Sequence, residues 1–345
     1  MTQHTAPTDA PTAPTAPRTP TPTERTRAVA ITGFGEADVL QVVDTELPLP
    51  GPGQVSVDVA YAGANFAEIL YRRGVVDVPL PFVPGIEVAG HVRAVGPGVE
   101  GLTVGQPVAA LTIVDGGGYA RTVTTAAELV APLDGLGLGL DLAAALPSNS
   151  TTAFLVLERV ARLAPGERVL VHAAAGGVGS QLGQVAHLLG ADRVVGTVGG
   201  PEKVETARGF GYQEVFLRDE MSGAGEFDVV VDMVGGPARH AGLALLAPMG
   251  RLIVMGNASG APDVGIPANE LWFTNRTVSG FNLAAFAAAR PAEAGRALRR
   301  AVAAAAQGRL TAQVETVPVA QVAQVHRRIE SGATTGKLVL DLAAL

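Results

Sequence analysis

Residues 168–190, with the sequence RVLVHAAAGGVGSQLGQVAHLLG, constrain the fold of this chain more than any other stretch. The apolar run at residues 169–172 has the length of a strand that is buried on both faces. A glycine-rich turn follows the run and leads into apolar residues at helical spacing. A strand, a glycine turn and a helix in this order form the first half of a βαβ dinucleotide-binding unit.

The glycines of this turn are of the kind that such a site requires. Gly176 and Gly177 allow the backbone to approach a pyrophosphate, and Gly179 allows the helix to pack closely against the strand. The first N–H groups of the helix and the positive end of its dipole favour an anion there. The turn departs from the usual G-x-G-x-x-G motif, because Ala174 stands at the first glycine. We expect the turn to contact the cofactor through Ala175, Gly176, Gly177, Val178 and Gly179.

The stretches that follow carry the same pattern further. Strands are predicted at 192–198, 226–232, 251–255 and 277–281, and segments of helix length separate them. Strands that alternate with helices are typical of a parallel sheet covered on both faces. The chain is therefore predicted to hold a doubly wound α/β domain of the Rossmann type, over residues 148–283.

The end of the second strand indicates which nucleotide is bound. An NAD site carries Asp or Glu there to hold the ribose 2′-OH, but this chain has Thr197 and Gly199. Lys203 follows within one helical turn, and Arg218 ends the next strand region. A basic corner without a carboxylate suits a 2′-phosphate, so we expect NADPH. The alternative is that Lys203 only decorates a helix surface, although the chain has just one other lysine.

Composition excludes several classes of function. The formal net charge of −7 and the lack of a basic cluster argue against nucleic acid and an anionic membrane surface as partners. No apolar run reaches the roughly 18 residues of a transmembrane helix. The chain has no cysteine, which excludes disulfides, thiolate catalysis and cysteine-ligated metals. We expect a cytoplasmic protein that acts on a small molecule.

The rest of the chain predicts a second domain and a tail. Residues 1–26 are rich in Pro, Thr and Ala and are expected to be a disordered tail. Residues 27–147 carry short alternating strands broken by glycine and proline, which is typical of an antiparallel, barrel-like β domain. Residues 284–345 hold a helix and further strands that are expected to complete this domain. The cofactor cleft is then expected where the two domains meet.

Several motifs in fixed order resemble a known family. They include NFAEILYRRG at 65–74, VPGIEVAGHVRAVGPG at 83–98, the HAAAGGVG turn, GNASG at 256–260 and GFNL at 280–283. The chain resembles the zinc-independent quinone oxidoreductases, the zeta-crystallin-like group of the medium-chain dehydrogenase/reductase superfamily. The resemblance implies a GroES-like β-barrel catalytic domain joined to a Rossmann domain. It also implies NADPH as cofactor and a homodimer that pairs through Rossmann edge strands.

The resemblance also bears on metal binding. Zinc-dependent members of the superfamily need Cys and His ligands around an open coordination position. This chain has Asn65 where the first ligand falls and Ile86 where the ligand histidine falls, which leaves Glu87 alone. The six histidines show no i,i+4 ligand spacing and are expected to be structural or exposed. No metal site is expected.

The chemistry that remains is hydride transfer to a quinone or to the C=C of an α,β-unsaturated carbonyl, where the carbonyl oxygen needs donors or a proton source. Asn65 is the first candidate, with a helix cap as its alternative. Tyr71 is a candidate proton donor, but it lies one position beyond the family tyrosine; the alternative is that it packs and that water supplies the proton. Thr152 matches a family threonine or caps a helix. Arg72 is expected to pair with Glu68 at i,i+4.

The family pattern implies further cofactor contacts, at Asn65, Thr152, Val234, Gly256, Asn257, Ser259, Phe281, Asn282, Leu283 and Lys337. The leading hypothesis is thus an NADPH-dependent quinone or enone reductase, with natural-product biosynthesis as one setting. Two alternatives remain open: an NADPH-binding regulatory or structural protein with little turnover, and a lyase or cyclase that keeps the fold.

Overall fold

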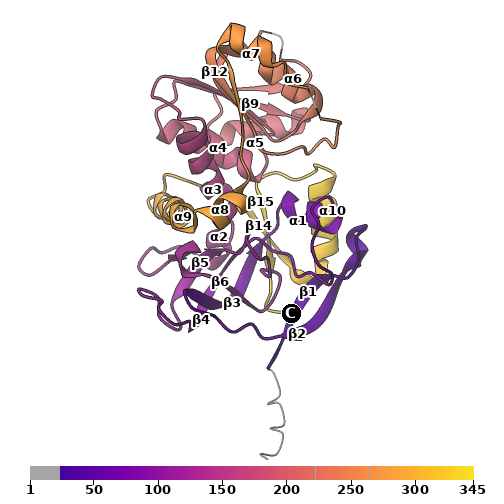
Figure 1. Ribbon diagram of the computed structural model, residues 1–345, viewed down its shortest axis with the longest axis vertical. Helices are drawn as coiled ribbons and strands as arrows, with labels where there is room; N and C mark the ends of the chain where they lie inside the picture. Colours follow the sequence, from indigo (N-terminus) through magenta and orange to yellow (C-terminus); the bar gives the residue numbers. More distant parts are fainter. Residues whose placement is uncertain (1–23, 222, 264) are drawn as a thin grey trace, which may run out of the picture.

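The computed structural model describes residues 24–221, 223–263 and 265–345, and within them two sheets dominate the fold. Figure 1 shows the parallel sheet and its helices in the upper half and the antiparallel strands in the lower half. Helices α8 (Leu283–Ala289) and α9 (Pro291–Ala306) lie between the two halves. The predicted fold class, a barrel-like β part joined to a Rossmann-type part, is confirmed.

The upper sheet has six parallel strands in the order β10-β9-β8-β11-β12-β13. This is the order of a doubly wound nucleotide-binding sheet, and it reverses between β8 and β11, where such sheets bind their ligands. The strands are β8 (Arg168–His172), β9 (Arg193–Val198), β10 (Glu214–Leu217), β11 (Phe227–Asp232), β12 (Leu246–Val254) and β13 (Thr277–Gly280).

Helices cover this sheet because its strands are apolar on both faces. Val169, Leu170 and Val171 of β8 have no exposed surface. The helices of this half are α4 (Gly177–Leu188), α5 (Val204–Gly209), α6 (Gly236–Ala244) and α7 (Ala268–Thr274). The loops at the carboxyl ends of the strands are thereby gathered at one edge of the sheet.

The lower sheet has seven strands: six lie on one path, β14-β15-β3-β4-β5-β7, and β6 pairs with β3. All of its pairings are antiparallel except β14 with β15. Its strands are β3 (Gln54–Gly63), β4 (Glu87–Val95), β5 (Pro107–Leu111), β6 (Thr122–Ala126), β7 (Val130–Pro132), β14 (Val314–Pro318) and β15 (Lys337–Asp341). Strands β14 and β15 bring the end of the chain back to the lower half of the molecule.

Four further helices connect these parts. Helix α1 (Phe66–Arg72) follows β3 and packs on α10 (Val322–Glu330). Helices α2 (Leu140–Ala143) and α3 (Pro147–Phe154) follow one another, and a π-helical turn, residues 155–160, continues α3. Residues 144–146 separate the two helices, and Pro147 takes the first position of α3, where its missing N–H leaves no helical hydrogen bond unmade.

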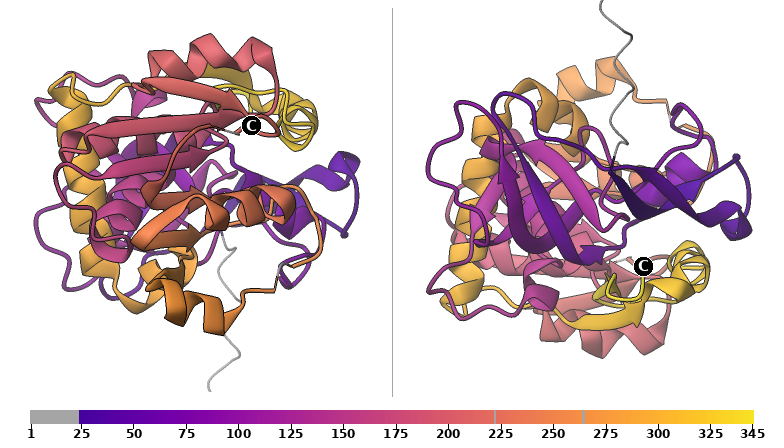
Figure 2. Two further views of the ribbon diagram at one scale, coloured as in Figure 1. Left: turned by 90° about the horizontal axis from the view of Figure 1, so that it is seen from above. Right: turned by 90° about the horizontal axis from the view of Figure 1, so that it is seen from below.

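Two sequence expectations were wrong in their boundaries. The tail was expected to reach residue 26, but β1 (Arg25–Ile31) begins at Arg25, because it pairs along its length with β2 (Leu40–Glu46). Figure 2 shows this β1–β2 ribbon at one side of the molecule. Residues 1–23 lie outside the described residues. The strand expected at 251–255 begins at Leu246, because Leu246 already pairs with Phe227 of β11. The exact domain boundaries stay a prediction.

Candidate active site

A cavity of about 880 Å³ lies between the two halves and takes its walls from both. The residues expected at the site come together here, except for Gly179 and Thr197. Those that line the cavity are Asn65, Tyr71, Thr152, Ala175, Gly176, Gly177, Val178, Gly199, Lys203, Arg218, Val234, Gly256, Asn257, Ser259, Phe281, Asn282, Leu283 and Lys337.

The glycine turn forms one wall of this cavity. Gly176 is the N-cap of α4, so the first N–H groups of the helix lie beside the cavity. A Cβ at Gly177 would lie 2.6 Å from Asn149 Nδ2, and one at Gly179 would lie 2.2 Å from Ala173 O. Glycine at 177 therefore leaves room for the neighbouring amide, and glycine at 179 lets the helix start against the strand end.

Thr197 is turned away from the cavity. Its side chain is fully buried and makes a 2.8 Å hydrogen bond with His172 Nδ1 across β8 and β9. Burial lowers the pKa of His172 to about 4, so the ring is neutral at neutral pH. Thr197 therefore belongs to the packing of the sheet, and the expectation that it reaches the cofactor is not supported by its position.

The corner at the end of β9 is basic, as expected, but it also holds a carboxylate. Arg218 lies over Gly199, 3.5 Å from where a Cβ would stand, and its buried Nε has no hydrogen-bond partner among the described residues. Lys203 Nζ donates to the carbonyl of Gly332 in the loop before β15. Glu202, the residue before Lys203, lines the same cavity. The sequence analysis missed Glu202, although its place just after the second strand is where such carboxylates occur.

A buried ion pair lies where the two halves meet. Lys337 Nζ donates to Glu87 Oε1 and to Asn65 Oδ1, and Asn65 Nδ2 donates to Glu87 Oε1 at 2.8 Å. The second oxygen of Glu87 accepts the N–H of Ser148, in the first turn of α3, at 2.7 Å. Glu87 is fully buried and Lys337 is 4% exposed. Strands β4 and β15 and the start of α1 together position this cluster.

A second carboxylate lies beneath this cluster. Glu68 is fully buried, and its two oxygens accept the N–H groups of Asn65 at 3.0 Å and Ile86 at 3.2 Å. Burial raises the pKa of Glu68 from 4.5 to about 7, although the charge of Lys337 partly opposes the shift. Glu68 thus holds its proton in the folded protein at pH values where the unfolded chain has lost it.

This shift predicts that stability falls as the pH rises. The folded state binds more protons than the unfolded state between pH 4.5 and about 7, so the free energy of unfolding decreases across this range by roughly 3 kcal/mol from this group. Urea denaturation at pH 5, 6, 7 and 8 measures the slope. Glu68→Gln should flatten it, and an unchanged slope in this variant would contradict the assignment.

Arg72 does not pair with Glu68, which corrects the expectation from their spacing. Its guanidinium instead contacts Glu330 Oε2 at 2.6 Å and the carbonyl of Gly35 at 2.5 Å. The physical reason is that Glu68 points inward to backbone N–H groups, while Glu330 lies at the end of α10, which packs on α1. Arg72 therefore joins these two helices.

Tyr71 of α1 and Thr152 of α3 both line the cavity. The Tyr71 ring packs edge-on against Phe82, with centroids 5.4 Å apart, and burial raises the pKa of its hydroxyl above its usual value of 10. Thr152 lies inside α3 rather than at its N-terminus, so it is not a helix cap. The alternative of an N-cap role for Thr152 is therefore wrong.

Comparison with known proteins gives the family. Family models match residues 51–143, described as an alcohol dehydrogenase GroES-like domain, and residues 189–340, described as a zinc-binding dehydrogenase. A rat synaptic vesicle membrane protein VAT-1 homolog is 32% identical, over 91% of this chain and 83% of its own. The chain belongs to the medium-chain dehydrogenase/reductase superfamily, in its zinc-independent, quinone-oxidoreductase-like group.

Solved structures of this superfamily support the assignment. A quinone oxidoreductase of Pseudomonas syringae is 31% identical, with a TM-score of 0.83 over 92% of this chain and all of its own. A mycobacterial protein, whose structure holds NADPH, has the same identity, TM-score and coverage. In the part of this chain that the structure describes, no group of three or more His, Cys, Asp or Glu side chains could hold a metal ion.

The apolar part of the cavity wall was largely absent from the expected site. It is built from side chains of α1, of the loops beside it and of the turn after β5. These residues are Phe66, Leu70, Val76, Ile86 and Ile113. The loop before β15 also lines the cavity, through residues 331–334 and 336. Apolar periodicity marks such residues as buried but does not separate a cavity wall from a core.

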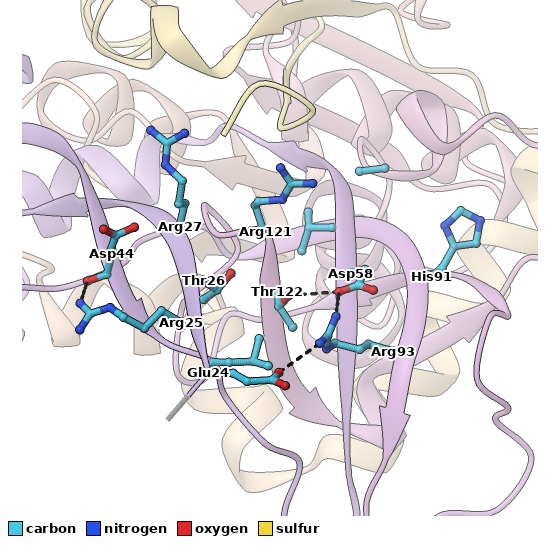
Figure 3. A pocket seen from close by; sticks show the side chains of 13 residues that line it. Glu24, Arg25, Thr26, Arg27, Asp44, Asp58, His91, Arg93, Arg121 and Thr122 are labelled. Carbon is cyan, nitrogen blue, oxygen red and sulfur yellow. Dashed lines mark hydrogen bonds and ion pairs between the residues drawn. The ribbon is translucent and has the colours of Figure 1, made fainter. Parts of the chain in front are cut away.

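A second cavity, of about 530 Å³, lies on the outer side of the β half (Figure 3). Of its four arginines, Arg93 pairs with Asp58 at 3.4 Å and with Glu24 at 3.6 Å. It holds none of the expected site residues. Across the described ranges, no helix is long and apolar enough to pass through a membrane.

Proposed function

We propose that this protein is a zinc-independent, NADPH-dependent reductase of quinones or of the C=C bond of α,β-unsaturated carbonyls. One observation carries the proposal: a single cavity is lined by a glycine turn, a basic corner, an apolar wall and the buried ammonium of Lys337. The cofactor end and the acceptor end are thus continuous, as hydride transfer requires.

The residues present fit a phosphorylated dinucleotide. In the turn at 175–178, Gly176 and Gly177 have no side chain, so their backbone is open to the cavity beside the start of α4. Arg218 leaves a buried Nε without a partner among the described residues, which an added phosphate would satisfy. Lys203 lies in the same corner. When bound, the cofactor supplies the hydride, and this chain holds and orients it.

The other expected cofactor residues are proposed to hold the nicotinamide half. They follow the ends of β11, β12 and β13, where the sheet order places a ligand. These residues are Val234, Gly256, Asn257, Ser259, Phe281, Asn282 and Leu283, with Lys337, Asn65 and Thr152 across the cavity.

At the acceptor end, the chain would exclude water and orient a flat, apolar molecule. Ile86 and Ile113 are buried beneath this pocket, and Tyr71 closes one side of it. Asn65, Tyr71 and Thr152 are the polar side chains that we propose for orienting the acceptor, with Asn65 fixed by its bonds to Glu87 and Lys337. A quinone or an enone has the matching chemistry, an apolar ring or chain with a polar oxygen.

The test is acceptor-dependent oxidation of NADPH. Purified protein is mixed with NADPH and 1,4-benzoquinone or a simple enone, and the loss of NADPH absorbance is followed. NADPH deuterated at the transferred position should give a labelled product. Tight NADPH binding without turnover would favour the regulatory or structural alternative, and product without label would favour a lyase or cyclase.

We also propose a homodimer that pairs through β13. This strand is an edge of the parallel sheet, and helix α7 precedes it directly in the chain. Trp272 and Phe273 of α7 are stacked at 4.7 Å and are 72% and 73% exposed. Two large aromatic side chains in water beside an open strand edge are typical of a subunit contact. The cytoplasmic location expected from the sequence stays a prediction.

The dimer predicts a specific effect of charge at this patch. Trp272→Glu should raise the dimer dissociation constant by about 100-fold, because it places a carboxylate in an apolar contact. Light scattering over a concentration series measures the effect. Leu49→Glu is the control, since Leu49 is 80% exposed and lies in the loop after β2. A monomeric wild-type protein, or a dimer that survives Trp272→Glu, would contradict this prediction.

A further inference from the structure

Lys337 is an ammonium held almost entirely inside the protein. It begins β15, it is 4% exposed, and it lines the cavity. Its Nζ donates to Glu87 and to Asn65, and an ammonium has three N–H groups. Among residues 24–221, 223–263 and 265–345, no acceptor is recorded for the third N–H. Since Lys337 lines the cavity, a molecule bound there can accept from this N–H.

The polar groups around Lys337 already form hydrogen bonds with one another. Glu87 accepts from Lys337, Asn65 and Ser148, so both of its oxygens are used. Asn65 accepts from Lys337 through Oδ1 and donates through Nδ2 to Glu87. A buried ion pair costs desolvation and stabilises a fold weakly. These bonds use two of the three Lys337 N–H groups and leave one donor for a molecule bound in the cavity.

The other polar groups near the cavity are less suited to deliver a proton. An amide such as that of Asn65 donates a hydrogen bond but does not release its proton. Burial, followed by the charge of Glu68, raises the pKa of Tyr71 above its usual value of 10. Glu68 itself is fully buried, and its oxygens accept backbone N–H groups rather than line the cavity.

We propose that Lys337 is the catalytic acid of the reduction and that it protonates the carbonyl oxygen of the acceptor; this role rests on the function proposed above. The hydride from NADPH forms a C–H bond at the β-carbon, and NADPH is oxidised to NADP⁺. The electron pair of the C=C bond moves toward the carbonyl oxygen. There a Lys337 N–H bond breaks and an O–H bond forms, the resulting enol becomes the saturated ketone, and solvent returns the proton to Lys337. With a quinone, the same hydride and proton give the hydroquinone.

The main test neutralises the ion pair as a whole. Lys337→Met alone strands the buried Glu87 carboxylate, so the informative variant is the double substitution Lys337→Met with Glu87→Gln. We expect kcat to fall by about 100-fold or more, the usual contribution of a general acid, with the dissociation constant of NADPH within about threefold. The matched control is Arg168→Met with Asp228→Asn, which removes a 2.9 Å ion pair that does not line the cavity and should keep kcat.

A readout without turnover tests the same contact. The p-nitrophenol oxyanion imitates the oxygen that gains charge, and its ionisation is visible in its absorbance. In the presence of NADP⁺, wild-type protein should bind it as the phenolate, and the double variant should lose this shift. Lys337→Arg keeps the charge but not the acidity, since the guanidinium stays protonated. This variant should retain the phenolate shift while kcat falls by about 30-fold or more.

Each outcome decides the proposal. A double variant or a Lys337→Arg variant with kcat within threefold of wild type would overturn it. So would a solvent isotope effect on kcat that survives in the double variant and disappears in Tyr71→Phe. If the double variant does not fold, Lys337→Arg still gives the answer. A wild-type protein without acceptor-dependent NADPH oxidation refutes the proposed function instead, whereas the Lys337 role fails in the variants.

Discussion

Replacing Arg218 with alanine should raise the dissociation constant for NADPH by about 100-fold while that for NADH stays within about threefold. The side chain lies over Gly199 at the end of β9, and its buried Nε has no hydrogen-bond partner among the described residues. A 2′-phosphate would accept charge-assisted hydrogen bonds from this guanidinium, and losing them costs roughly 2–3 kcal/mol. Calorimetric titration of both cofactors measures the two affinities.

The matched control for this experiment is Arg208→Ala. Arg208 is exposed on α5 and pairs with Glu205 at 2.5 Å, one turn away on the same helix. Its removal takes away an equal charge from the same region without touching the cavity, so both affinities should stay as in the wild type. Equal affinity of the wild-type protein for NADPH and NADH would refute the phosphate role of this corner. Glu202 would then be the residue to examine for a ribose hydroxyl, since it lines the same corner.

Gly179→Ala should lower the free energy of unfolding by about 3 kcal/mol or more, because the added methyl group has no space. Its Cβ would lie 2.2 Å from Ala173 O and 2.9 Å from Ala174 Cα, which are backbone atoms and cannot rotate away. Ala173 already has a φ of +57°, and Tyr212 donates from its hydroxyl to Gly179 O at 2.5 Å. The backbone at Gly179 is therefore fixed by Ala173 and by Tyr212, and the turn between β8 and α4 cannot shift to make room. Urea denaturation followed by circular dichroism measures the loss.

Gly209→Ala is the control for this substitution. Gly209 ends α5, and a Cβ there would meet no atom within 4 Å. Alanine is the better helix former, so this variant should be as stable as the wild type or more stable by up to about 1 kcal/mol. If both variants lost stability equally, the effect would come from glycine replacement in general rather than from the contact with Ala173. A fully stable Gly179→Ala would show that the turn can open without cost.

The parts of the fold that the sequence predicted are those with a local signal. The strand, glycine turn and helix at residues 168–190 appear as β8 and α4, with the same turn between them. The basic corner could also be found, because Lys203 and Arg218 follow two neighbouring strands and the carboxyl ends of parallel strands meet at one edge. Boundaries were less accurate where pairing decides them, as at β1, whose first residues resemble the Thr-rich segment before them.

The chemistry of the acceptor end was decided by tertiary structure alone. Lys337 meets Glu87 across 250 residues of sequence and Asn65 across 272, and no local pattern announces such a contact. The i,i+4 spacing of Glu68 and Arg72 suggested an ion pair, yet burial gives Glu68 backbone partners and gives Arg72 to Glu330, 258 residues away. Hydrophobic periodicity and turn residues thus predicted the parallel sheet and the nucleotide end of the cavity, since both depend on residues that are close in sequence. The packing of β15 on β3 and of α10 on α1 decided which charged side chains pair. A buried charge needs a partner, and only the tertiary structure determines which one is near.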